Sequence, residues 1–132
     1  MLRKKVLLTC LAAIVLCVAG IALAKAVKVD LNPISDGDQD PGCGFVIFND
    51  TSGPENVQVQ MSLKGALPNT DYVVIVHVGG SDTPVATITT NAEGNANFHY
   101  SGSADPVPGN WVGLGLRREG DWQFGTGQVD IF

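Results

Sequence analysis

An acidic stretch near the start of the chain carries the residues best suited to bind a metal ion. Segment 36–42 reads DGDQDPG, with carboxylates at alternate positions among turn-forming residues. This spacing lets Asp36, Asp38 and Asp40 converge on a hard cation, and Ca²⁺ prefers oxygen ligands of this kind. No cofactor is expected, and Ca²⁺ is the best candidate if a metal binds here. The alternative is a solvated acidic loop between two strands.

The stretch does not match an EF-hand loop. Pro41 occupies the sixth position, where glycine belongs, and Ile47 occupies the twelfth, where glutamate closes the site. A Ca²⁺ site would have to be closed by another carboxylate, such as Asp50 or Glu55.

Two tryptophans near the C-terminus predict a second kind of site. A turn at Glu119-Gly120 would pair Arg117 with Trp122 and place Trp111 on the same face, with glycines between them. An aromatic face with an arginine and glycine gaps can stack a sugar ring or take an apolar partner. The candidate ligand-binding residues are therefore Trp111, Arg117 and Trp122.

Two alternatives remain open for this face. In the first, the sandwich covers both faces of the hairpin; in the second, a bulge turns one tryptophan into the core. Strict alternation also places Phe124 on the tryptophan face and Gly125 on the face of Val112, Leu114 and Leu116.

Four further residues resemble the ligands of a copper site by type alone. They are His77, His99, Cys43 and Met61, but they lie on separate predicted strands rather than in one loop near the chain end. A copper protein, or a small metal-dependent enzyme using the two histidines, is an alternative reading of the function.

The motifs of common catalytic sites are missing from the sequence. It has no nucleophile elbow, no His-Glu-x-x-His pair and no glycine-rich phosphate loop. Paired carboxylates for glycoside hydrolysis would need a groove that a small sandwich rarely builds. We therefore expect a protein that is not an enzyme.

The net charge of the chain limits which classes of macromolecule it can bind. The 132 residues carry a formal net charge of −5, whereas a nucleic-acid binder needs a basic face that displaces counterions from phosphates. We expect no nucleic-acid partner. An extracellular protein or a cell-surface polysaccharide remains possible.

The N-terminus predicts export. Residues 1–24 begin with MLRKK, continue as an apolar run and end in Ala-Leu-Ala, as a helical signal peptide does; an uncleaved anchor is the alternative. The predicted mature domain is 25–132, secreted, periplasmic or on the cell surface. It would touch a membrane only through an uncleaved segment 1–24. Cys43 would be its single cysteine, expected as a small buried side chain, with an intermolecular disulfide or a metal ligand as alternatives.

Hydrophobic alternation then predicts strands throughout the mature chain. About eight are expected: 27–31, 43–49, 57–64, 72–78, 85–90, 95–100, 110–118 and 122–132. Short strands separated by turn residues are typical of an antiparallel sandwich.

One corner sharpens that expectation. Pro68, Thr70 and Tyr72 precede an apolar strand and resemble the tyrosine corner of fibronectin type III and immunoglobulin-like sandwiches, which implies structural roles for all three. Segments 43–49 and 87–98, the second taken as a hairpin, resemble an uncharacterised family of small exported bacterial and archaeal β-sandwich proteins.

These patterns together predict an all-β chain, an antiparallel immunoglobulin/fibronectin-III-like β-sandwich of seven to eight strands. The expected function is an exported, non-catalytic binding or structural module for protein or cell-surface interaction, with Ca²⁺ as a possible stabiliser. A carbohydrate-binding module using exposed tryptophans is the main alternative.

Overall fold

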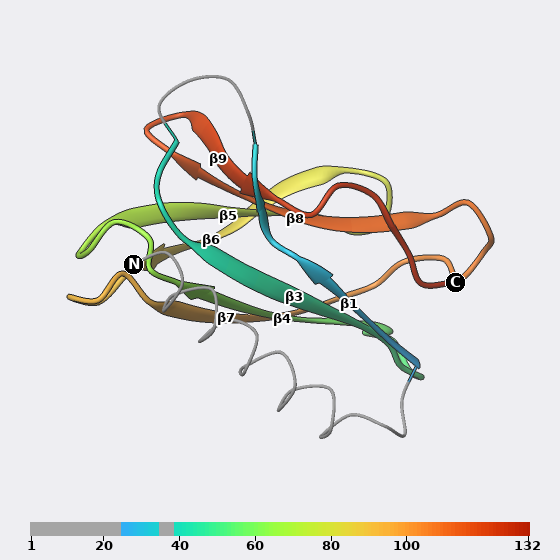
Figure 1. Ribbon diagram of the computed structural model, residues 1–132. Helices are drawn as coiled ribbons and strands as arrows, with labels where there is room; N and C mark the ends of the chain where they lie inside the picture. The colour runs from blue at the N-terminus through green and yellow to red at the C-terminus, as the bar shows by residue number, and fades with distance from the viewer. Residues whose placement is uncertain (1–24, 35–38) are drawn as a thin grey trace.

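Two antiparallel sheets make up the protein in a computed structural model that describes residues 25–34 and 39–132 (Figure 1). The predicted signal peptide, residues 1–24, and the predicted calcium ligands Asp36 and Asp38 lie outside the described residues. Within the described part of the chain, no helix is long and apolar enough to cross a membrane.

The first sheet has four strands in the order β1-β3-β4-β7. Their bounds are Lys25–Asp30, Cys43–Asp50, Val57–Lys64 and Ala96–Gly102. Strand β4 follows the alternation of its sequence, because Val57, Val59, Met61 and Leu63 are all buried.

The second sheet runs in the order β2-β9-β8-β5-β6, and β10 pairs with β8 at its end. The bounds of these strands are Asn32–Pro33 (β2), Asp121–Gly125 (β9), Trp111–Arg118 (β8), Asp71–His77 (β5), Asp82–Thr89 (β6) and Val129–Asp130 (β10). Figure 1 shows this sheet, with β5, β6, β8 and β9, lying across the sheet that carries β3, β4 and β7.

Side chains from both sheets meet in one core between the layers. Phe48 and Leu63 come from the first sheet, and Tyr72, Leu116 and Phe124 come from the second; each is almost completely buried. This arrangement is a β-sandwich, as the period-two pattern predicted. All eight predicted strands are present, and the last is split into β9 and β10 by residues 126–128.

The segment before β3 belongs to both sheets. Strand β1 pairs with β3 in the first sheet, and β2 pairs with β9 in the second. Leu31 lies between them, 2% exposed, and its N–H donates to the carbonyl of Gly44 over 3.0 Å. The chain therefore crosses from one sheet to the other at this residue.

The prediction of a hairpin over residues 87–98 is wrong, because β6 and β7 lie in different sheets. The connection is an arch between layers. The side-chain oxygen of Asn91 accepts the backbone N–H groups of Glu93 and Asn95, and Gly94 has a φ of +77°. Local turn residues indicated a reversal but not which sheet the next strand would join.

The β8–β9 hairpin confirms the predicted turn. Glu119 and Gly120 both have positive φ, and Arg117 pairs with Trp122 as expected. Past that pair the register shifts, so that Leu116 faces Phe124 and Gln123 is the extra residue of a β-bulge.

The bulge corrects the predicted faces. Phe124 points into the core and is fully buried, whereas Gly125 pairs with Gly115 on the outer face. Trp122 precedes the bulge and stays on that outer face. The bulge therefore supplies the core with a phenylalanine, not with a tryptophan.

Candidate functional site

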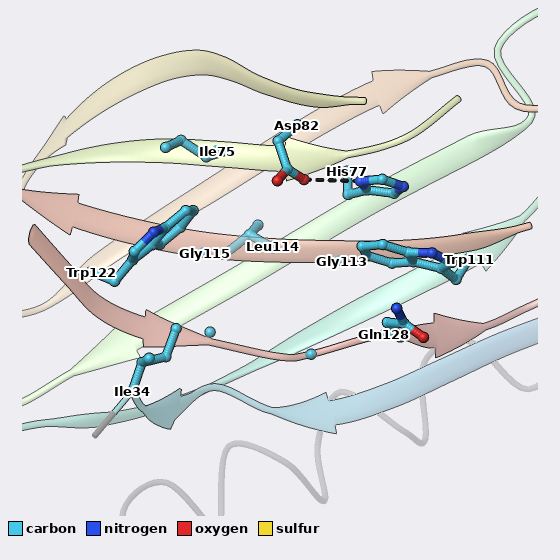
Figure 2. A pocket seen from close by; sticks show the side chains of 12 residues that line it. Ile34, Ile75, His77, Asp82, Trp111, Gly113, Leu114, Gly115, Trp122 and Gln128 are labelled. Carbon is cyan, nitrogen blue, oxygen red and sulfur yellow. Dashed lines mark hydrogen bonds and ion pairs between the residues drawn. The ribbon is translucent and has the colours of Figure 1, made fainter. Parts of the chain in front are cut away.

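A pocket of about 280 Å³ lies on the outer face of the second sheet (Figure 2). Its walls carry the two tryptophans together with residues from the neighbouring strands. The lining comprises Ile34, Ile75, His77, Asp82, Trp111, Gly113, Leu114, Gly115, Trp122, Gly125, Gly127 and Gln128. The predicted tryptophan pair is thus brought to one hollow of the surface.

One end of the pocket is an aromatic stack. The rings of His77 and Trp111 lie parallel, with centroids 3.5 Å apart and an interplanar angle of 4°. Nδ1 of His77 lies 2.8 Å from a carboxylate oxygen of Asp82, at the start of the next strand. Figure 2 shows this Asp82 carboxylate on the side of the pocket formed by β5 and β6. The stack and the hydrogen bond fix the position of both polar groups.

The other end is formed by Trp122. A Cβ atom added to Gly115 would lie 2.3 Å from Cζ3 of Trp122, so the indole lies directly on this glycine. The guanidinium carbon of Arg117 lies 4.1 Å from the centroid of the same indole, a cation–π contact. Arg117 does not line the pocket itself and acts on it only through this contact with Trp122.

Glycines form the floor of the pocket because a larger residue there would clash with the groups packed on it. A Cβ at Gly113 would approach Trp111 to 3.3 Å, and one at Gly125 would approach Ile34 to 2.4 Å. Figure 2 shows Gly113 and Gly115 between the two indoles, with Ile34 across from Ile75. The glycines thus let Trp111, Trp122 and Ile34 pack directly against the backbone of the sheet.

The predicted ligand-binding residues are therefore placed as follows. Trp111 and Trp122 both line the pocket, half-buried, and Arg117 stands behind Trp122. His77, Asp82 and Ile34 also belong to this site and were not predicted from the sequence. Alternation along β5 and the turn at 79–81 could have indicated the first two, but no local pattern places Ile34 there.

Asp40, predicted as a calcium ligand, takes part in a buried ion pair. Its carboxylate receives two hydrogen bonds from Arg118, Nε to Oδ2 over 2.6 Å and Nη2 to Oδ1 over 2.7 Å. The hydroxyl of Tyr72 donates to Oδ2 over 2.7 Å. The backbone N–H of Asp40 donates to Oε1 of Gln123 over 3.0 Å. Both carboxylate oxygens are thus engaged by the protein.

This network shifts the pKa values of its members. Burial pushes the pKa of Asp40 upward, but the hydrogen bonds from Arg118 and Tyr72 and the charge of Arg118 outweigh burial, so the net pKa is lowered. Burial, followed by the hydrogen bond to Asp40, raises the pKa of Tyr72 well above its usual range. The hydrogen bond to Asp40 likewise raises the pKa of Arg118. Asp40 stays ionised and Arg118 stays charged at neutral pH.

The remaining metal candidates do not come together. His77 is on β5 in the second sheet, whereas His99 is on β7 in the first and pairs with the exposed Gln60. Met61 is buried in the core. The sulfur of Cys43 is in a disulfide bond and is not available as a metal ligand. Within residues 25–34 and 39–132, no three His, Cys, Asp or Glu side chains gather closely enough to hold a metal ion.

The predicted corner residues make local contacts. The hydroxyl of Thr70 donates to the carbonyl of Pro68 over 2.8 Å, and the N–H of Thr70 donates to Oγ1 of Thr90 over 2.9 Å. Tyr72 is fully buried, and its hydroxyl reaches Asp40 as well as the backbone of Leu67. These contacts join the start of β5 to the end of β6.

Comparison with known proteins gives no relative: no protein-family model, curated protein or solved structure matches this chain.

Proposed function

We propose that this protein is an exported, non-catalytic binding module that holds a saccharide in the pocket between Trp111 and Trp122. The observation that carries the proposal is that both indoles line one pocket on the outer face of the second sheet, half-buried, instead of being packed in the core. Export rests on the signal-like sequence of residues 1–24.

The two indoles contact neighbouring positions on the outer face of one strand. Gly113 and Gly115 lie two residues apart on one face of β8, roughly 7 Å along an extended strand. Trp111 lies against the first glycine and Trp122 against the second. A sugar ring bound in the pocket would place its apolar C–H face against one of these indoles.

Polar groups at the edge would orient such a ring. Binding pockets are mostly apolar, with a small number of polar groups that fix orientation. Here the His77–Asp82 pair stands at one side and Gln128 stands beside Trp111. Sugar hydroxyl groups, which donate and accept hydrogen bonds, are the complement of this edge.

The strand order also favours an immunoglobulin/fibronectin-III-like class for the sandwich. Strands β3, β4 and β7 correspond to A, B and E, and β6, β5, β8 and β9 correspond to C′, C, F and G. Tyr72 then lies on C, whereas the tyrosine corner of immunoglobulin domains precedes F. The class therefore rests on strand order and not on the corner.

Titration with saccharides tests the proposal. The chain has two tryptophans, and both line the pocket, so intrinsic fluorescence reports on this site alone. Soluble oligomers of glucose, N-acetylglucosamine, xylose and mannose serve as probes. We expect at least one to produce a saturable change, with calorimetry giving the same Kd.

Variants assign the binding to the pocket. Trp111→Ala and Trp122→Ala should each weaken binding by roughly tenfold, because one aromatic stacking contact contributes about 1 kcal/mol or more. His99→Ala, an aromatic change on the other sheet, is the matched control and should bind normally. If no oligomer changes the fluorescence or releases heat at millimolar concentration, the proposed function is wrong.

A further inference from the structure

We infer that the preferred saccharide of this pocket is an amino sugar with a free ammonium group, which pairs with Asp82. This inference rests on the proposed saccharide site and adds the chemical class of its ligand.

Asp82 is the only acidic or permanently charged side chain in the lining. One carboxylate oxygen is held at 2.8 Å by Nδ1 of His77, while 64% of the side chain remains exposed. Among the described residues, no hydrogen bond or ion pair engages the second oxygen. The His77 contact therefore positions the carboxylate while leaving an acceptor for the ligand.

The aromatic walls place a cation at this same end. A cation is attracted to the face of a tryptophan ring. Trp122 already has Arg117 at 4.1 Å from its centroid, so positive charge stands behind that wall. The end formed by Trp111, His77 and Asp82 has no arginine or lysine in the lining. A ligand ammonium is thus repelled from one end and attracted to the other.

Charge complementarity excludes the opposite class of saccharide. Uronic acids and sulfated sugars would bring an anion to a pocket whose formal charge is negative, on a chain with net charge −5. Repulsion of this kind falls with added salt, because the screening length is about 10 Å at 0.1 M and about 3 Å at 1 M.

Three trimers of similar size test the inference. They are β-1,4-linked glucosamine, its N-acetylated form and a trimer of galacturonic acid, each titrated at low ionic strength. The glucosamine trimer should bind about fivefold more tightly than the N-acetylated trimer, which is the effect of one partly exposed ion pair. The galacturonic acid trimer should bind most weakly. The preference should shrink in 1 M salt.

Two matched variants locate the preference. Asp82→Asn should bring the Kd values of the glucosamine and N-acetylated trimers together. Asp71→Asn removes the same charge from an exposed residue of β5 outside the pocket, where its carboxylate accepts from Thr89, and should keep the preference. The thermal midpoints of both variants check that they are folded.

The outcomes separate this inference from the proposed function. Equal binding of the glucosamine and N-acetylated trimers overturns the amino-sugar inference and leaves the saccharide site standing. The same holds if Asp82→Asn keeps the preference. Tighter binding of oligolysine than of the glucosamine trimer overturns the inference in favour of a basic peptide. Absence of binding by every saccharide overturns both.

Discussion

The pair formed by Asp40 and Arg118 gives a prediction in which the two partners are not equivalent. The Asp40 side chain is 4% exposed, whereas that of Arg118 is 26% exposed. Arg118→Met keeps the aliphatic stem of the arginine but leaves a carboxylate buried without its cation. Asp40→Asn leaves an arginine that can still reach water. The first variant should therefore be the more damaging.

The losses of unfolding free energy expected for the two variants differ in magnitude. Removing one partner of a buried ion pair costs about 3–5 kcal/mol. Tyr72 still donates to Asp40 in Arg118→Met, so we expect the lower end, about 3 kcal/mol at pH 7. In Asp40→Asn, Arg118 turns towards solvent and one amide oxygen still accepts. The expected cost there is about 1–2 kcal/mol.

The pH dependence has a definite sign. In the wild type the pKa of Asp40 is lowered, so its contribution to stability is present above the unfolded value of about 3.9 and is lost as the pH falls through the folded value. In Arg118→Met the cation is gone and burial raises the pKa of Asp40. The variant is then relieved by protonation as the pH falls. Its deficit relative to the wild type should shrink from pH 7 towards pH 4.

Urea denaturation followed by far-ultraviolet circular dichroism at pH 7, 5.5 and 4 measures these differences. Arg117→Met is the control, since Arg117 has a cation–π contact with Trp122 but no ion pair among the described residues. It should cost about 1 kcal/mol or less and show little pH dependence. The reasoning is refuted if Arg118→Met costs no more than Arg117→Met, or if its deficit grows as the pH falls.

Two other predictions concern the pocket floor and the acidic loop. Gly115→Ala should lift Trp122 from the sheet, because the new Cβ meets the far edge of the indole. The tryptophan emission should shift and saccharide binding should weaken, with little loss of stability. Unchanged emission and affinity would contradict this. If Asp36 and Asp38 hold Ca²⁺, millimolar Ca²⁺ should raise the Tm, and the double variant Asp36→Ala/Asp38→Ala should abolish this rise. Equal Tm values in Ca²⁺ and in chelator would rule out the calcium site.

Strand positions were predictable because their signal is local. Residues Val57 to Lys64 alternate apolar and polar side chains, and the structure buries the apolar set. The turn at Glu119-Gly120 was equally readable, because Gly120 readily adopts the positive φ that a tight hairpin needs, and Glu119 also adopts it in the structure. Each of these features depends on neighbours within a few residues.

The bulge at Gln123 could not be read in this way. Alternation assumes that every residue advances the strand by one pairing position, and an inserted residue exchanges the faces beyond it. Phe124 and Gly125 therefore change sides with no local warning. The compensating contact, from Asp40 N–H to the Gln123 side chain, joins residues that are far apart in the sequence.

The role of Asp40 could not be predicted either, because its partner is distant in the sequence. Three aspartates at alternate positions suggest a cation, and the guanidinium that satisfies the third comes from the end of β8. The histidines illustrate the converse. His77 gains its significance from Trp111 on the adjacent strand, a contact fixed by sheet order and not by spacing.

The crossing of the chain at Leu31 has a consequence for the order of folding. Strand β2 pairs with β9, so the first described segment completes its hydrogen bonds only with residues close to the C-terminus. Closing so long a loop is entropically costly, and contacts of high sequence separation form slowly. The β1–β3, β3–β4, β5–β6 and β8–β9 pairings can form early, while β2 docks last. In a chain released from its N-terminus onward, β2 therefore stays unpaired until β9 has emerged.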